Sequence, residues 1–278
     1  METPIVYTLC SGSSGNAVFL RFGDVRFLVD CGKNAKHLTE LLASIGESPQ
    51  QLSAIFITHE HIDHIRGLKV FAKRYRLPVY MTLASAQAAA QMPGFTEIDT
   101  LCVREGPFTE DVCGVRVTAV SVPHDSAACV AYFFSAPCGK IGVATDIGYL
   151  TNRLVARLCE CDGVVLEANY DPDLLENGPY PYLLKQRIRS DGGHLSNPEC
   201  ARCALALAKA GVKSILLAHL SAENNTPELA YQTVFTKLAT ELCEANCHIC
   251  VAQRHTATRM QFAAAPVPDA LSGEAIVC

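Results

Sequence analysis

The sequence predicts an α+β fold in which two mixed β-sheets are flanked by helices. First, residues 5–30 hold three strand-like segments, and a tight turn at Gly23-Asp24 joins the last two. Second, later strand-like segments alternate with helix-like ones, as parallel strands joined by crossovers do. Third, no repeat or low-complexity linker interrupts the 278 residues. A single domain spanning 1–278 is therefore expected.

The individual elements follow from hydrophobic periodicity and from the turn residues between them. Apolar alternation or continuous apolar runs predict strands at 5–9, 17–22, 25–30, 52–58, 79–82, 115–122, 129–134, 141–145, 163–168, 214–218 and after Cys247. Helical patterns predict helices at 35–45, 65–75, 83–91, 151–160, 197–210 and 226–244. The core is expected to span about 5–255, and the segment 263–278 is expected to be a tail outside it.

Composition narrows the class of protein. Hydrophobic residues make up 49% of the chain, which is ample for a buried core, and the longest apolar runs are too short to span a bilayer. No signal peptide is visible, so a cytoplasmic protein without a membrane partner is expected. The net charge of −5 excludes a uniformly basic surface, but basic groups at 66–76 and 185–189 allow local contacts to phosphate.

The chain has 14 cysteines, and we expect them to be reduced and mostly buried. Two C-x-x-C pairs, Cys200/Cys203 and Cys247/Cys250, have the spacing of a zinc ribbon. The first pair falls in a predicted helix, and the second leads into a predicted strand rather than a knuckle turn. A structural zinc at these pairs is therefore the less favoured interpretation.

The stretch "ITHEHIDHIRG" at 57–67 concentrates groups that bind metals. In extended backbone His59 and His61 point to the same side, whereas Asp63 and His64 begin the following helix and turn away. One metal can bind His59 and His61, while Asp63 and His64 face a second centre. Imidazole with carboxylate suits Zn, Fe or Mn. The sequence therefore predicts a metal site of the hydrolytic type.

Four further polar residues each terminate an apolar strand-like segment. Asp30 closes "VRFLVD", His124 follows "VTAVSVP", Asp146 follows "IGVAT", and His219 follows "SILLA". Loops at strand ends carry functional groups on a rigid scaffold. We therefore expect these residues to join the histidine cluster in one site.

The histidine stretch and the polar residues at the strand ends follow one another along the chain in an order that resembles the motifs of the metallo-β-lactamase superfamily. The resemblance implies a four-layer αββα sandwich with two metal ions at the edge between the sheets. It implies the following roles: one metal bound by His59, His61 and His124, the other by Asp63, His64 and His219, Asp146 bridging both, and Asp30 supporting the ligand loop.

Further strings narrow the resemblance within the superfamily. Many β-lactamases have Cys where this chain has Asp146, and flavodiiron reductases have Glu where it has His61. Glu167 in "EANY" and His194 in "GHLS" resemble extra motifs of nucleases in the superfamily. The strings "SGSSGN", "ATDIGY" and "LLKQRIRSDGGHLSN" look like those of the bacterial WalJ/YycJ (VicX) proteins, a family described as cytosolic and linked to DNA exonuclease activity. The chain lacks the Gly- and Pro-rich arm and the inserted domain of RNA-processing relatives, which favours DNA over RNA.

The function expected from this resemblance is a metal-dependent phosphodiesterase, favoured as a DNA exonuclease. Two divalent ions (Zn, Mn or Fe) would hold a hydroxide, which Asp63 and Asp146 orient. His194, oriented by Glu167, would donate a proton to the leaving oxygen or bind the phosphate.

Four residues are expected to support the site. Ser13 and Asn16 lie in a loop that either presents backbone N–H groups to a phosphate or is only a tight turn. Ser221 and Asn224 are expected to fix the geometry of His219. Two alternatives stay open: a hydrolase of a small thioester or lactone on the same fold, and a regulatory binding protein that retains its metals. The sequence leaves open the metal, the cleavage polarity and the oligomeric state.

Overall fold

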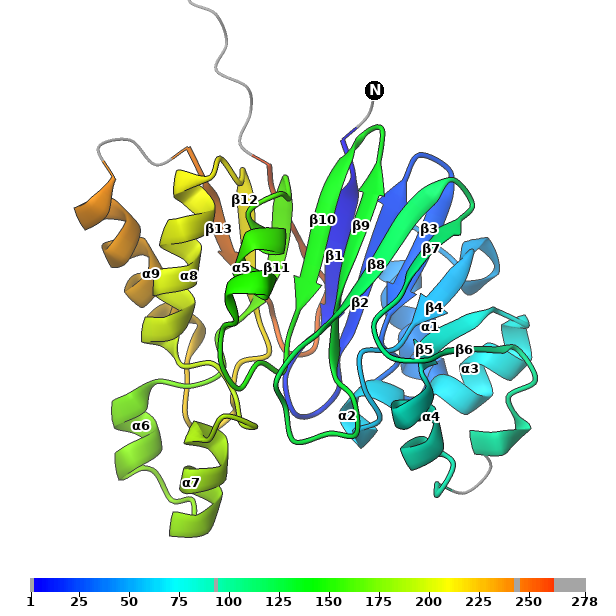
Figure 1. Cartoon of the computed structure of the whole chain (residues 1–278), viewed down its shortest axis with the longest axis horizontal. Coiled ribbons are helices and arrows are strands. Elements are labelled where there is room, and N and C mark those ends of the chain that lie inside the picture. The colour runs from blue at the N-terminus through cyan, green and yellow to red at the C-terminus, as the bar shows by residue number, and fades with distance from the viewer. Residues whose placement is uncertain (1–2, 93–94, 243–245, 263–278) are drawn as a thin grey trace, which may run out of the picture.

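Two mixed sheets form the centre of the molecule, as the computed structural model shows for residues 3–92, 95–242 and 246–262. The sheets pack face to face, and helices cover the outer face of each (Figure 1). Most strands are apolar on both faces, so each sheet must be covered on both sides. One face packs on the other sheet and the other face on helices, which gives four layers. The predicted αββα sandwich is confirmed.

The first sheet is built from the N-terminal part of the chain and one short late strand. Its strand order is β14-β1-β2-β3-β4-β5-β6. The first hairpins are antiparallel, whereas β3 to β6 are parallel. The strands are β1 (Ile5–Cys10), β2 (Ala17–Phe22), β3 (Val25–Val29), β4 (Ala54–Phe56), β5 (Val79–Thr82), β6 (Leu101–Arg104) and β14 (Thr258–Arg259). The helices on this side are α1 (Ala35–Ser44), α2 (Ile62–Ile65), α3 (Leu68–Tyr75) and α4 (Leu83–Ala89), with 3-10 turns η1 (Pro49–Gln51) and η2 (Phe95–Glu97).

The second sheet has the order β13-β12-β11-β10-β9-β8-β7, with β10 to β13 parallel. Its strands are β7 (Thr109–Val112), β8 (Val115–Ser121), β9 (Val130–Ala136), β10 (Gly139–Ala144), β11 (Gly163–Glu167), β12 (Ser214–Ala218) and β13 (His248–Val251). The helices of this half are α5 (Asn152–Leu158), α6 (Pro172–Asn177), α7 (Tyr182–Arg189), α8 (Asn197–Lys209) and α9 (Pro227–Glu241). Helices α6 and α7 project beyond the sheet ends, at the lower edge of Figure 1.

Aromatic side chains fill the space between the two sheets. The rings of Phe27 and Phe56 lie 5.5 and 5.4 Å from that of Phe134 across the sandwich, and all three are buried. Such pairs add to the stabilisation that burial alone provides. The sandwich therefore holds its two sheets, and the loops at their ends, in a fixed relation.

The structure differs from the predicted elements in several places. The predicted helix 65–75 is two helices, α2 and α3, separated at Gly67, where a Cβ would lie 2.0 Å from the Lys33 carbonyl oxygen. Strands β6, β7 and β14 and helices α6 and α7 were not predicted, and the predicted strand 52–58 extends only over Ala54–Phe56. The end of the predicted helix 226–244 and the tail 263–278 lie outside the described residues, so the single domain over 1–278 stays a prediction. Within the described ranges, no helix is both long and apolar enough to cross a bilayer.

Candidate metal centre

Loops from both sheets converge at one end of the sandwich. Asp30 follows β3, the 57–64 loop follows β4, Asp146 follows β10, and His219 follows β12. These strands run parallel within each sheet, so their carboxyl ends meet at the same edge. Asp30, Asp146 and His219 have φ of 65°, 58° and 57°, a conformation that non-glycine residues seldom adopt. Backbone strain of this kind is concentrated at functional sites.

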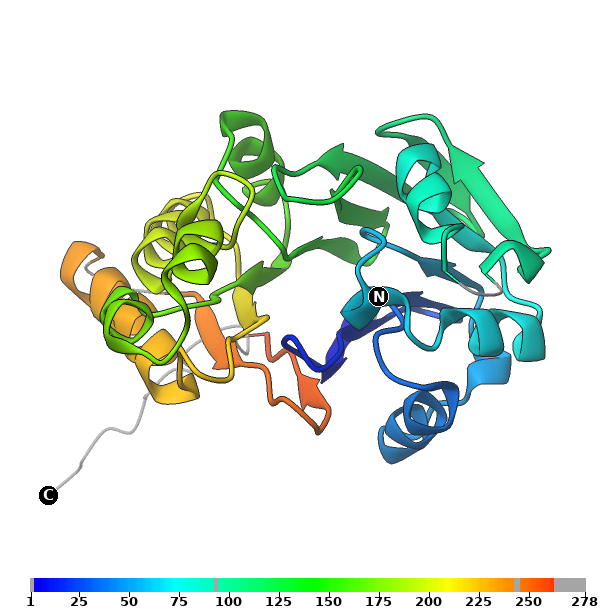
Figure 2. The same ribbon diagram turned by 90° about the horizontal axis from the view of Figure 1, so that it is seen from below.

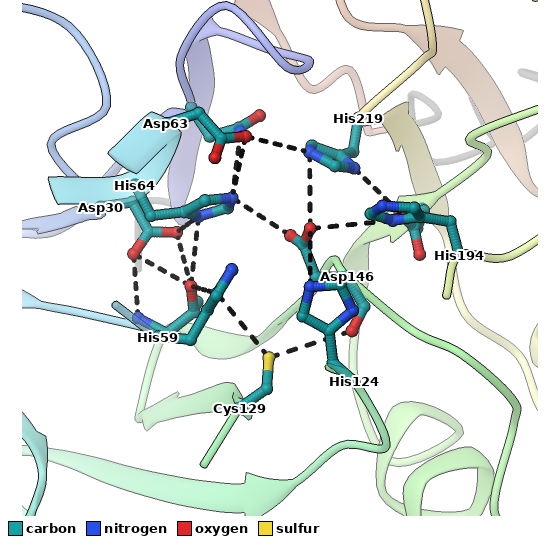
Figure 3. Close-up of polar contacts among 12 residues, drawn as sticks. Asp30, His59, Asp63, His64, His124, Cys129, Asp146, His194 and His219 are labelled. Carbon is teal, nitrogen blue, oxygen red and sulfur yellow. Dashed lines mark hydrogen bonds and ion pairs between the residues drawn. The ribbon is translucent and has the colours of Figure 1, made fainter. Parts of the chain in front are cut away.

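Four overlapping groups of side chains could each hold a metal ion. Two of them include Asp146, one with His59 and His64 and one with Glu167, His194 and His219. The remaining two are the sets of three that the resemblance implied, and they are called the first and the second group. In each group, the candidate ligand atoms lie within 4.8 Å of one another. Asp146 lies between the two groups, with its carboxylate 3.3 Å from His64 and 3.7 Å from His124, as Figure 3 shows. The first group comprises His59, His61 and His124, and the second comprises Asp63, His64 and His219. The structure thus brings together all seven residues that the resemblance implied as ligands.

Several buried polar atoms of the site have no hydrogen-bond partner among the described residues. They are the Nε2 atoms of His59, His124 and His219 and the Oδ2 atom of Asp146. Burying such groups unpaired costs free energy, which a bound cation offsets by accepting their lone pairs. Imidazole and carboxylate together suit Zn, Mn or Fe ions. The residues present therefore fit the binding of divalent metal.

In the first group, uncharged partners orient the imidazoles. His124 donates through Nδ1 to the Gly193 carbonyl oxygen at 3.0 Å, and His59 Nδ1 lies 3.0 Å from the Thr58 hydroxyl. Burial and the neighbouring imidazoles hold the pKa of His59 well below its usual range. Burial also lowers the pKa of His124. Both rings are therefore neutral near pH 7, as metal binding requires.

In the second group, carboxylates orient the imidazoles. His64 Nδ1 lies 2.7 Å from Asp30 Oδ2, and His219 Nδ1 lies 2.9 Å from Glu167 Oε1. Burial opposes a charge on His219, but carboxylates that include Asp146 and Glu167 raise its pKa to about 10. Burial likewise opposes a charge on His64, but Asp146 and Asp30 raise its pKa well above the usual value. This arrangement makes the second group rich in negative charge.

His194 and Glu167 form a pair beside the two groups. His194 Nδ1 donates to Glu167 Oε1 at 2.8 Å, while Glu167 Oε2 accepts from the backbone N–H groups of Ile147 and Leu195. Glu167 is fully buried, and its pKa is nevertheless lowered because the charges of His194 and His219 outweigh burial. His194 keeps partial exposure and lines the cleft above the metal groups. Glu167 therefore fixes a histidine that can still reach a substrate.

The "SGSSGN" loop packs against the histidine motif. Asn16 accepts from the Gly12 N–H through Oδ1 at 2.8 Å, and its Nδ2 lies 3.1 Å from His64 Nε2 and 3.3 Å from Asp63 Oδ2. Ser13 lines the cleft. Asn16 thus positions residues of the second group, while Ser13 faces the space where a substrate would lie.

Sequence reasoning missed several residues that hold or border the site, among them Asn169 and Asp125. Asn169 donates to the His219 carbonyl oxygen at 2.8 Å, and Asp125, next to His124, lines the cleft. Ser221 also lines the cleft, whereas Asn224 donates to the Ser221 hydroxyl and not to His219. The supporting role of Asn224 stays a prediction. A polar residue two positions beyond the end of β11 is the signal that would have pointed to Asn169.

No cysteine is among the candidate metal ligands in the described part of the chain, although Cys129 Sγ lies 3.8 Å from His59 Nδ1, as Figure 3 shows. Of the twelve cysteines that the structure describes, none forms a disulfide. Cys200 and Cys203 are buried in α8, and burial raises their pKa values. These two thiols pack as small apolar side chains in the core beneath α8.

Comparisons with other sequences agree with this arrangement. Residues 25–220 match the family model of the beta-lactamase superfamily domain. The chain is 38% identical over 233 residues to a Streptococcus pneumoniae protein named exodeoxyribonuclease WalJ, covering 83% of this chain and 87% of the relative. It is 34% identical over 226 residues to a Bacillus anthracis protein named exodeoxyribonuclease YycJ, covering 81% and 86%.

Solved structures share the fold at lower identity. The metallo-β-lactamase fold protein YhfI from Bacillus subtilis matches with a TM-score of 0.69 and 18% identity, covering 92% of this chain and 100% of that chain. The short form of human tRNase Z matches with a TM-score of 0.62 and 17% identity, covering 91% and 98%. The chain therefore belongs to the metallo-β-lactamase superfamily and, within it, to the group of WalJ- and YycJ-like proteins.

Proposed function

We propose that this protein is a metal-dependent phosphodiesterase that acts as a DNA exonuclease. The observation that carries the proposal is the convergence of two metal-binding groups on Asp146, beside the His194–Glu167 pair in an open cleft. The two relatives named exodeoxyribonuclease are similar over more than four fifths of the chain, which supports DNA as the substrate. A cytoplasmic location is part of the same proposal.

In this proposal, the site would hold two divalent ions. One would be held by His59, His61 and His124 and the other by Asp63, His64 and His219, with Asp146 between the two groups. When bound, such ions supply Lewis acidity and make a water molecule acidic enough to act as a nucleophile at neutral pH. Burial opposes a charge on Asp63 and Asp146, but neighbouring histidines hold the pKa values of both below their usual range, so both carboxylates are anionic and would offset the positive charge of bound ions.

His194 then acts on the leaving group. Glu167 accepts its Nδ1–H and so leaves the Nε2 side of the ring facing the cleft. The imidazolium form of His194 donates a proton from Nε2 to the departing oxygen of the sugar, and Glu167 stabilises that charged form. The ordered His194–Glu167 pair favours this reaction over thioester hydrolysis, because a thiolate can leave without a general acid whereas the oxygen of a sugar needs a proton.

The experiment that tests this proposal is metal analysis combined with a comparison of substrates. The protein, reconstituted separately with Zn, Mn and Fe, is given end-labelled single- and double-stranded DNA, and S-lactoylglutathione in parallel. We expect two metal equivalents per chain and stepwise shortening of DNA, with little thioester cleavage. Preferred cleavage of S-lactoylglutathione would support the thioester alternative. Metal binding without turnover of any substrate would support a regulatory binding protein.

A further inference from the structure

A helical arm (residues 171–193) lies between β11 and α8, at the end of the molecule that carries the metal groups. It contains α6 and α7, and Figure 2 views it from that end. The arm has a small hydrophobic cluster of its own, in which Leu175 and Ile188 are buried against Tyr170, and Tyr180 and Leu184 pack on them. Because of this cluster, the arm is a preformed element rather than a loose connection.

Backbone hydrogen bonds tie the arm to the metal centre. The carbonyl oxygen of Gly193 accepts from His124 Nδ1 at 3.0 Å, and that of Gly192 accepts from the Asp125 N–H at 2.9 Å. A Cβ at position 193 would lie 2.1 Å from the Ile188 carbonyl oxygen, so only glycine fits this close approach. The arm and the first metal-binding group therefore hold a fixed relative position.

One face of α7, together with Tyr180 two positions before the helix, forms part of the cleft wall. Tyr180, Leu184, Arg187 and Ile188 line this cleft together with the metal-binding residues. Its volume is about 250 Å³. Pockets that enclose a whole drug-sized ligand have ~300–1,000 Å³. The cleft therefore suits one terminal unit of a polymer, with the rest of the strand continuing outside.

Arg187 is the single Lys or Arg among the described residues that line the cleft. Its Nε–H donates to the Asp125 carboxylate, which holds the guanidinium at the rim. An arginine has five N–H donors, so the guanidinium can bind a phosphate while it stays paired with Asp125. The Arg187 guanidinium is therefore placed to bind a phosphate next to the phosphate that would lie at the metal-binding residues.

A further exposed residue of α7, Leu183, lies next to this wall. Leu183 precedes Arg187 by one turn and so lies beside it on the same side of α7. Leu183 is 77% exposed, although it is a large apolar side chain. Its neighbour Tyr182 is 71% exposed but lies on the opposite side, where its hydroxyl accepts from Gln186 at 2.5 Å. Leu183 is not part of the cleft lining, so it places exposed apolar surface beside Arg187, outside the cleft.

We propose that α7 and Tyr180 receive the single-stranded end of a DNA substrate. Tyr180 stacks on the terminal base, Arg187 binds the adjacent phosphate, and Leu183 packs against the next base. Stacking on a side chain requires an unpaired base with a free face, which single strands offer along their length. One arginine at the rim, with apolar side chains on either side of it, complements a strand in which phosphates alternate with flat bases. This inference rests on the proposed nuclease function.

The test is steady-state cleavage of end-labelled single-stranded and blunt duplex DNA by the metal-loaded full-length protein. The variants are Tyr180→Ala, Arg187→Gln and Leu183→Ser, with Tyr182→Ser as the matched control. Stacking of one base is worth ~1–3 kcal/mol, which corresponds to a ~5- to ~150-fold change in binding. We expect KM for single-stranded DNA to rise within this range for Tyr180→Ala and Arg187→Gln, and about fivefold for Leu183→Ser, with kcat little changed. Tyr182→Ser should change KM by less than about twofold.

The possible outcomes separate this inference from the proposed function. If the wild type cleaves no DNA at all, the nuclease proposal and this inference both fail. If the wild type cleaves DNA and the three variants match Tyr182→Ser, only the inference fails. An equal rise in KM for single-stranded and duplex DNA would also overturn it, since it would remove the role of unpaired bases. Leu183→Ser changes an exposed side chain, so its result does not depend on the stability of the fold.

Discussion

The two metal-binding groups differ in what stands behind their histidines. In the group of His59, His61 and His124, a hydroxyl and a backbone carbonyl contact the second ring nitrogen of His59 and His124. In the group of Asp63, His64 and His219, buried carboxylates contact both imidazoles. A carboxylate that accepts a hydrogen bond from the second ring nitrogen of a histidine raises the basicity of the ring and strengthens its bond to a metal.

Because of this difference, the two candidate groups would not be equivalent binding sites if both hold a metal ion. The second group adds the charges of Asp63, Asp30 and Glu167, so we expect it to bind a divalent ion more tightly than the first. The first group is closer to neutral and lies against the arm through Gly193. Its ion is expected to exchange more easily and to lie nearer the bound substrate.

The largest effect is expected from the residue that the two groups share. Asp146→Ala removes a carboxylate that lies within 3.8 Å of His64, His124, His194 and His219. We expect the loss of at least one metal equivalent and a fall in DNA cleavage of at least ~10³-fold, because each ion contributes several kcal/mol to transition-state stabilisation. Elemental analysis and a nuclease assay measure both quantities, and circular dichroism checks the fold. Full metal content in this variant would show that the groups do not depend on Asp146.

A smaller effect on DNA cleavage is expected from replacing His194, which lines the cleft but is in neither of the two groups. His194→Ala should retain both metal equivalents and slow DNA cleavage by ~10²- to 10⁴-fold, the range for loss of a general acid. Cleavage of bis(p-nitrophenyl) phosphate, whose leaving group needs little protonation, should fall less. His255→Ala, at an exposed position, serves as the control. If metal content fell in His194→Ala, His194 would be a ligand instead of a proton donor.

The contiguous part of this site could be predicted from sequence, and the scattered part only through resemblance. The spacing in "HEHIDH" separates His59 and His61 from Asp63 and His64, and two of the four candidate groups in the structure show the same division, with His61 as the residue before α2. His124, Asp146 and His219 follow β8, β10 and β12 of the second sheet. They come together through the pairing of β8 to β12, and they meet the histidine motif through the packing of the two sheets. No local pattern contains that information.

The arm shows what single-sequence reasoning overlooks. Helices α6 and α7 are short, so a 3.6-residue period has little length in which to appear. One local signal was present: Asp171 before Pro172 is an N-cap followed by proline at the first helical position. The salt bridge of Arg187 to Asp125 spans 62 positions and has no counterpart in the sequence pattern. The basic residues at 185–189 were visible, but not their place at the cleft.

The smallest effect is expected from a change at Asp30, which contacts a histidine of the second group and is not itself in that group. Asp30 accepts from the Thr58 N–H at 2.9 Å and contacts His64 Nδ1. In Asp30→Asn, the side-chain amide would donate to His64 Nδ1, which forces the proton onto Nε2 and removes the lone pair needed by a metal. We expect affinity for one of two metal equivalents to fall ~10- to 100-fold, as for other changes behind a metal-binding histidine.

Isothermal titration with Mn²⁺ measures this difference between the two sites. Asp24→Asn, at the exposed turn that leads into β3, is the matched control and should leave both affinities unchanged. Weakening of the tighter site alone would assign that site to Asp63, His64 and His219. Equal weakening of both sites would mean that the two groups act as one unit, because a perturbation at His64 would then reach His59 and His124 through the shared carboxylate of Asp146.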